Sequence, residues 1–346
     1  MSKGKHVKPS PYSKPKFKKS LLFVLLSLAL LCIAFDILTP ATDTKSIAST
    51  NEQENVSTSE ASVEPEPVVI EPSKDENMEL LIKYEMEKYN FNENNFYFFF
   101  YNISDKKYYF YNENTYFTAA STIKVPVAMY YYDEINSGNY TLDTGILYAS
   151  GCYEAGGGNI GSLYSVGDKV PLKNLLEQVI VNSDNTAINI LMANLGYSDV
   201  KKAITKYSDE TIPDDFYTSN IASASFYFDV MNYLYEHQNE YTTLIDHMKK
   251  SSMGKYLKEY ITDYDVSHKY GSYSGYVHDY GIVFTEKPYL VGIFTKGIPN
   301  SDEVIAKISK DILDYNLGNL DVNSLFPEEE NNNTLNTTNS TANTNS

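Results

Sequence analysis

The sequence predicts an α+β domain in which strands from both ends of the domain form one antiparallel sheet, packed against a mostly helical block. Helical spacing of apolar residues dominates a long middle stretch, and aromatic, strand-like runs come before and after it. Segments 39–76 and 321–346, on either side of this pattern, have too few large apolar side chains to fold. Because the helical block separates the two sets of strands, they must pair with each other to cover their apolar faces.

The predicted order of elements is a helix, two strands, several helices, three strands and a final helix. Apolar side chains at helical spacing predict the first helix at 76–89. The aromatic runs 96–101 and 107–111 flank a turn-like Ser-Asp pair and predict a hairpin. The same two periodicities predict helices at 122–135, 172–181, 186–195, 223–235 and 303–315, and strands at 270–273, 276–285 and 289–295.

Both ends of the chain have biased compositions. Segment 1–19 carries lysines and no acid, and the apolar segment 20–38 follows it, a pattern typical of a signal anchor whose N-terminus stays in the cytoplasm. We expect a single-pass membrane protein; secretion after cleavage is the alternative, because the apolar run is short for a bilayer. The compositions of 39–76 and 321–346 predict a disordered linker and a disordered Asn/Thr-rich tail. One folded domain is expected at 77–320.

Charge and composition argue against several classes of partner. The formal net charge is −17 and the chain has no arginine, so we expect no nucleic-acid binding. The five histidines show no metal-ligand spacing, and we expect neither a metal nor another cofactor. Two cysteines, one of them in the apolar segment, supply no disulfide framework. A monomer is expected.

Ser121 and Lys124 open a predicted helix and carry the first reactive pair. A spacing of three places the hydroxyl and the amine on one helical face. A lysine can take the proton of a nucleophilic serine once burial lowers its pKa, and the free N–H groups at a helix start can stabilise an oxyanion. Alone, this spacing also fits an N-cap serine beside a solvated lysine.

Two further motifs follow in the chain. Ser-Asp-Asn at 183–185 lies between two predicted helices, where these residues would also suit a turn or a cap. Lys-Tyr-Gly-Ser at 269–272 begins a predicted strand, in which the glycine permits close approach of a ligand or another backbone. The three motifs in this order arise by chance far less often than any one of them.

With these motifs, the chain resembles the class A β-lactamases and penicillin-binding proteins. The resemblance includes the surrounding segments 118–126, 175–189 and 278–283 and covers about 78–317. It implies that Ser121 is acylated and that Lys124 shuttles its proton.

The resemblance also implies roles for the other two motifs. Ser183 would relay a proton to the leaving nitrogen, Asn185 would bind the amide side chain of the substrate, and Lys269 would position its carboxylate. Gly271 and Ser272 would line the site, and the backbone N–H of Ser121 with an N–H just after Gly271 would form the oxyanion hole. The implied substrate is a β-lactam or a peptidoglycan-type small molecule.

Two departures from the family pattern bear on turnover. In class A β-lactamases, a Glu-x-x-Leu-Asn loop after Ser-Asp-Asn activates the water that clears the acyl-enzyme, and no glutamate between Asn185 and Lys269 has that context. Asp214 and Asp215 are the only acids we consider as substitutes. Tyr270 stands where a threonine or serine is expected. Acylation without efficient deacylation is therefore predicted.

The leading interpretation is an extracytoplasmic serine hydrolase, acylated at Ser121 by β-lactam or related amide and ester substrates. A penicillin-binding D,D-peptidase acting on peptidoglycan stem peptides is the second, favoured by the expected anchor and by the missing glutamate. The third is a non-catalytic envelope protein that binds or senses a ligand. Ser121, Lys124 and Lys269 argue against it, because a binding module has no need of a nucleophile together with a base.

Overall fold

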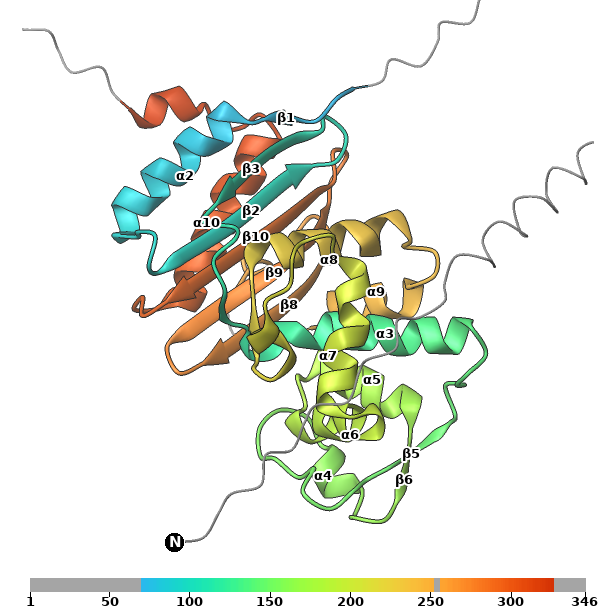
Figure 1. The fold of residues 1–346 in the computed structure, drawn as a ribbon. Helices are drawn as coiled ribbons and strands as arrows, with labels where there is room; N and C mark the ends of the chain where they lie inside the picture. Colours follow the sequence, from blue (N-terminus) through green and yellow to red (C-terminus); the bar gives the residue numbers. More distant parts are fainter. Residues whose placement is uncertain (1–69, 252–255, 327–346) are drawn as a thin grey trace, which may run out of the picture. The chain divides into compact units, whose positions relative to one another are not determined.

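The computed structural model describes residues 70–251 and 256–326, which lie in one compact unit of the chain, 67–346. A six-stranded sheet is covered by two helices on one face and adjoins a helical block on the other (Figure 1). The α+β class and the order of the main elements are as the sequence predicts.

The sheet joins strands from both ends of the domain in the order β1-β3-β2-β10-β9-β8. Its central pair is β2 with β10, which run antiparallel, with Phe99 opposite Gly292. All neighbours are antiparallel except β1 and β3. The strands are β1 (Ser73–Lys74), β2 (Phe96–Asn102), β3 (Lys107–Tyr111), β8 (Asp265–Tyr273), β9 (Tyr276–Phe284) and β10 (Tyr289–Lys296). Strand β8 therefore forms one edge of the sheet.

Two helices pack on the outer face of the sheet, and the other long helices lie on the inner face or in the block beside it (Figure 1). The outer helices are α2 (Glu76–Tyr89) and α10 (Ser301–Asn316), with the short η4 (Val322–Leu325) against α2. The inner set is α3 (Lys124–Asn136), α5 (Leu172–Val181), α6 (Asn185–Leu195), α7 (Tyr197–Ala203), α8 (Ala224–Glu236) and α9 (Thr242–Lys249).

Short elements connect the helical block. They are β4 (Phe117–Thr118) paired with β7 (Ile221–Ala222), β5 (Gly145–Leu147) paired with β6 (Lys169–Pro171), α4 (Ile160–Leu163), and the 3₁₀ turns η1 (Ala120–Ile123), η2 (Ile204–Tyr207) and η3 (Asp214–Tyr217).

Alternating residues of β2 enter two different cores. Phe96, Phe98 and Phe100 belong to the outer core under α2 and α10, whereas Tyr97 and Phe99 belong to the core shared with the helical block. Successive side chains of a strand point to opposite faces, so a strand covered on both faces must be apolar throughout. This explains the continuous aromatic run in the sequence.

The folded region extends beyond the predicted 77–320 at both ends. Strand β1 lies inside the segment expected to be a disordered linker, where it pairs with β3, and Asp75 caps α2 by accepting the Met78 N–H at 3.0 Å. The turn η4 lies in the expected tail, 321–346. These elements are too short to produce an apolar periodicity, so no periodic signal in the sequence marks them.

The predicted signal anchor falls outside the described residues, together with the basic segment before it. Within 70–251 and 256–326, no helix is both long enough and apolar enough to cross a membrane.

Candidate active site

Ser121 lies in the turn η1, between β4 and α3, rather than in the α-helix that the sequence predicts there. The preceding residue, Ala120, has φ +50°, a left-handed conformation that costs a non-glycine residue about 1 kcal/mol or more. Hydrogen bonds on both sides hold the turn: the Ala119 N–H donates to the Asn220 carbonyl at 2.9 Å, and the Asn220 side chain donates to the Ala120 carbonyl at 3.0 Å. The serine is therefore presented on a fixed, strained turn.

Strand β8 passes directly over this turn at Gly271. A Cβ atom at Gly271 would lie 2.8 Å from the Ser121 backbone nitrogen and 3.0 Å from that of Thr122. Only glycine permits this approach without moving the turn. The next residue along the strand, Ser272, is exposed.

Lys124 begins α3 and points into the junction between α5 and α6. Its Nζ donates to the Ser183 carbonyl at 2.7 Å, the Ser183 Oγ at 3.1 Å and the Asn185 Oδ1 at 2.8 Å. Its side chain is buried, and among the described residues it hydrogen-bonds to no carboxylate. Burial lowers its pKa to about 8, against smaller opposing effects of the negative charges of Asp184 and Glu154.

The Ser-Asp-Asn segment is held by its central residue. The Asp184 carboxylate accepts the Ala187 N–H at 2.8 Å, which caps α6, and the Ile160 N–H at 2.9 Å. Both oxygens are thus engaged by the backbone, so Asp184 positions its neighbours. Ser183 itself has φ +53°, a second strained residue at the site.

Lys269 reaches the same serine from β8. Its buried Nζ donates to the Ser183 Oγ at 3.0 Å and to the Tyr270 carbonyl at 2.9 Å. Burial, and next the nearby charge of Lys124, hold the Lys269 pKa well below its ordinary value. The structure thus gathers Ser183, Asn185 and the two lysines into one hydrogen-bonded group, with Gly271 against the Ser121 turn.

Tyr270 occupies the position where the resemblance expects a threonine or serine. Its ring stacks on Tyr256 at a centroid distance of 5.0 Å and lies 4.0 Å from the Lys269 Nζ. Burial raises the pKa of the Tyr270 phenol to about 12, partly opposed by the nearby Ser183 hydroxyl, yet the phenol forms no hydrogen bond of good geometry. A large aromatic ring thus replaces a small hydroxyl beside Lys269.

Sequence reasoning missed two groups at the site. Glu154 accepts the Asn185 Nδ2 at 3.1 Å; it lies before the Ser-Asp-Asn motif, whereas the family pattern places its glutamate after that motif. The second is a buried pair, His268 Nδ1 and Asp279 Oδ2 at 2.6 Å, which joins β8 to β9 next to Lys269.

Asp214 and Asp215, the acids considered as substitutes for the missing glutamate, lie in η3 with exposed side chains. In the described part of the chain, neither side chain hydrogen-bonds to any of the predicted site residues.

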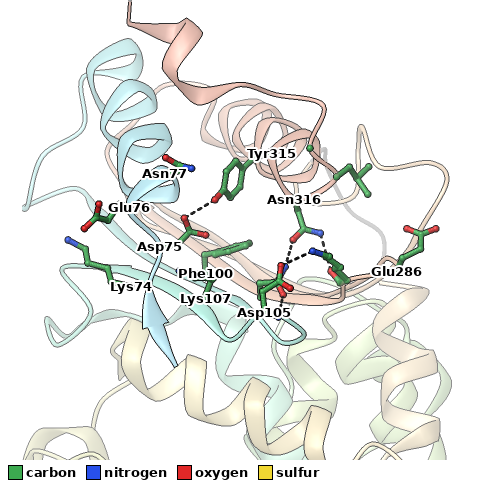
Figure 2. A pocket seen from close by; sticks show the side chains of 14 residues that line it. Lys74, Asp75, Glu76, Asn77, Phe100, Asp105, Lys107, Glu286, Tyr315 and Asn316 are labelled. Atoms are coloured by element: carbon green, nitrogen blue, oxygen red, sulfur yellow. Dashed lines mark hydrogen bonds and ion pairs between the residues drawn. The ribbon is translucent and has the colours of Figure 1, made fainter. Parts of the chain in front are cut away.

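A separate open hollow of about 900 Å³ lies at the far end of the sheet, between the start of α2 and the end of α10 (Figure 2). Some of its polar groups pair with one another: Tyr315 donates to Asp75 at 2.7 Å (Figure 2). Lys287 forms an ion pair with Asp105 at 2.9 Å. None of the predicted site residues lines it.

A sequence profile of the β-lactamase enzyme family matches residues 81–316. The chain belongs to this family. In this β-lactamase-family domain, the match covers the helical block and every strand of the main sheet except β1, including all three motifs, and it confirms the resemblance seen in the sequence. A comparison with curated protein sequences finds no match.

Solved structures similar to this β-lactamase-family domain include both penicillin-binding proteins and β-lactamases. PBP-A is 18% identical, with a TM-score of 0.62 over 73% of this chain and 100% of that one. A PBP-A mutant, solved as an acyl-enzyme complex with penicillin G, is 19% identical, with a TM-score of 0.61 over 70% and 97%. A β-lactamase from Sphaerobacter thermophilus is 21% identical, with a TM-score of 0.59 over 68% and 96%. At identities this low, the structural similarity establishes a shared fold and nothing more.

Proposed function

We propose that this domain is a serine hydrolase in which Ser121 is acylated by β-lactams or by related amide and ester substrates. The observation that carries the proposal is the state of Lys124, a buried amine three residues from Ser121 whose pKa is lowered to about 8. At that pKa roughly 10% of the amine is neutral at pH 7, enough to accept a proton from the serine.

In acylation, the Ser121 Oγ attacks the substrate carbonyl while Lys124 takes the hydroxyl proton. The backbone N–H of Ser121 and an N–H of β8 just after Gly271 stabilise the negative charge on the carbonyl oxygen. The carbon–nitrogen bond then breaks, and Ser183 passes a proton to the leaving nitrogen and takes its replacement from Lys124, which returns to the neutral amine. The two lysine hydrogen bonds to the Ser183 Oγ support this role, because they occupy its lone pairs and leave its proton free to be donated.

The remaining site residues bind the substrate in this proposal. Asn185 faces its amide side chain, Lys269 positions its carboxylate, and Gly271 and Ser272 line the strand along which it lies. The burial of Lys269 without a hydrogen-bonded carboxylate among the described residues supports an anion-binding role.

A penicillin-binding D,D-peptidase acting on peptidoglycan stem peptides is the second candidate. The positions of Asp214 and Asp215 favour it, since exposed carboxylates without contact to the site offer no replacement for the water-activating glutamate. A non-catalytic binding or sensor module is the least supported, because it gives no reason to bury a lysine of lowered pKa beside the serine.

Incubation of the full chain with a fluorescent penicillin distinguishes these functions. A covalent label that persists supports the peptidase, and a label that appears and is lost as penicillin turns over supports a β-lactamase. A chain that binds penicillin reversibly and never becomes labelled would be a binding module, and the hydrolase proposal would be wrong.

We also propose that segment 20–38 anchors the protein in the cell membrane, with the domain outside. The lysines of 1–19 support this orientation. Cell fractionation should find the chain in the membrane fraction, with the domain open to added protease. A mature protein free in the medium, beginning near Thr42, would instead establish cleavage.

A further inference from the structure

Glu154 is a positioned carboxylate beside the proposed active site. Its Oε1 accepts the Asn185 Nδ2 at 3.1 Å, and its Oε2 accepts the Asn189 Nδ2 at 2.8 Å. The Thr186 hydroxyl fixes its backbone by donating to the Glu154 carbonyl at 3.0 Å. Three residues of one α6 turn thus hold an otherwise exposed side chain, and among the described residues no lysine forms an ion pair with it.

The contact with Asn185 bears directly on substrate binding. Because Lys124 donates to the Asn185 Oδ1 at 2.8 Å, the Nδ2 of that side chain must face Glu154. In the proposed function, this Nδ2 donates a hydrogen bond to the amide carbonyl of the substrate. The Nδ2 carries two N–H groups, so one can donate to the substrate carbonyl while the other still donates to Glu154, which then lies beside the bound acyl side chain. A neutral acyl side chain offers this carboxylate no donor as strong as an ammonium group.

The space next to Glu154 suits a cation. A hollow of about 220 Å³ is lined by Tyr153, Glu154, the glycines 156–158 and the start of α6, and no lysine lines it. Tyr153 is 65% exposed, so its ring is open to a ligand. A carboxylate beside an accessible aromatic ring attracts an ammonium group both by charge and by cation–π contact.

We propose that Glu154 is a specificity-determining residue, and that it selects acyl donors with a primary ammonium group on the side chain next to the scissile carbonyl. The inference rests on the proposed function and names its substrate class. The ammonium group forms an ion pair with the Glu154 carboxylate, while the second N–H of the Asn185 Nδ2 donates to the substrate amide. Amine-bearing peptides and amine-bearing β-lactams share this chemistry.

The test compares ampicillin with penicillin G, which differ by one amino group on the acyl side chain. Second-order rate constants for covalent labelling of the full chain are measured with both compounds, at a pH low enough to keep the ampicillin amine protonated. We expect the wild-type chain to favour ampicillin, and Glu154→Gln to lower the ratio of the two constants about three- to fivefold, the worth of one ion pair near the surface. Glu240→Gln, the same change of charge at an exposed residue between α8 and α9, should leave the ratio unchanged.

The possible outcomes distinguish a failure of the proposed role of Glu154 from a failure of the proposed function. Labelling by both compounds with the same ratio in the wild-type chain and in Glu154→Gln would overturn the role of Glu154 and leave the hydrolase intact. An equal loss of the preference for ampicillin in Glu240→Gln would show that the overall charge of the chain causes this preference. That result would also overturn the inference. Failure of both compounds to label the wild-type chain would remove the proposed function, and the inference with it.

Discussion

Lys124 and Lys269 donate hydrogen bonds to the same oxygen, the Ser183 Oγ, at 3.1 and 3.0 Å. One lysine comes from the helix after the Ser121 turn and the other from the edge strand of the sheet. Burial lowers the pKa of Lys124, and burial together with the nearby charge of Lys124 lowers the pKa of Lys269. The pair makes Ser183 the centre of the site.

The first prediction concerns the protonation of Lys124. Acylation should become faster as the pH rises and reach half of its maximum near pH 8, because only the neutral amine accepts the Ser121 proton. Lys124→Ala should slow labelling by a factor of about 10²–10⁴ and abolish this rise. The labelling rate constant measured between about pH 6 and about pH 10 is the readout. A labelling rate that does not change with pH in the wild-type chain would show that a group other than Lys124 accepts the Ser121 proton.

The second prediction concerns the close approach of strand β8 to the Ser121 turn. Gly271→Ala should slow acylation by about 10²-fold, since its Cβ would lie 2.8 Å from the Ser121 nitrogen and push the turn out of position. Gly297→Ala is the matched control, because its Cβ meets no atom within 4 Å although its φ of +68° strains the backbone. Thermal melts should show both variants folded. Normal labelling of Gly271→Ala would refute the geometry of the oxyanion hole.

The third prediction concerns deacylation. A missing general base costs about 10²–10⁴ in rate, so about one equivalent of penicillin should open in a burst, followed by much slower turnover. Asp214→Asn and Asp215→Asn should change neither phase, because both carboxylates are exposed and, within 70–251 and 256–326, form no hydrogen bond with the predicted site residues. Stopped-flow absorbance of the β-lactam separates the two phases. Fast turnover lost in either variant would identify the base.

The fourth prediction concerns Lys201, which is buried and forms no ion pair with any other described residue. Its Nζ lies 3.6 Å from the centre of the Phe216 ring and 3.4 Å from the Ile221 carbonyl oxygen, and burial lowers its pKa to about 7. As the pH falls from the ordinary 10.5 toward 7, the unfolded chain binds a proton that the folded chain excludes, so stability falls.

Lys201→Met should therefore raise the free energy of unfolding. Each unit of pKa shift is worth about 1.4 kcal/mol, so the gain should be several kcal/mol near pH 7 and should shrink as the pH approaches 10.5. Urea denaturation at both ends of this range measures it, with Lys202→Met, at an exposed neighbour, as the control. A gain independent of pH would show that packing, and not the charge, is responsible.

The main elements could be predicted because each carries its own periodic signal. The aromatic run in β2 and the amphipathic face of α5 both span enough residues to fix the type of element. Helix α9 was missed because only Leu244, Ile245 and Met248 mark its buried face within eight residues. The 3₁₀ turn at Ser121 was also missed, since its shape depends on Asn220, which lies far along the chain.

The motifs of the site could be read because each is a short run of consecutive residues. Their convergence on Ser183 required the fold, and so did the contact between Tyr270 and Tyr256. Glu154 could not be found from the sequence, because the two asparagines that hold it come 31 and 35 residues later. Sequence spacing alone does not reveal which distant side chains will share a carboxylate.

Peptide mapping of the penicillin-treated chain by mass spectrometry is the most direct test of Ser121 as the nucleophile. We expect one added penicilloyl mass, located on the peptide that contains Ser121, and no added mass on a folded Ser121→Ala variant. An adduct on any other residue, or an adduct that persists in Ser121→Ala, would contradict it.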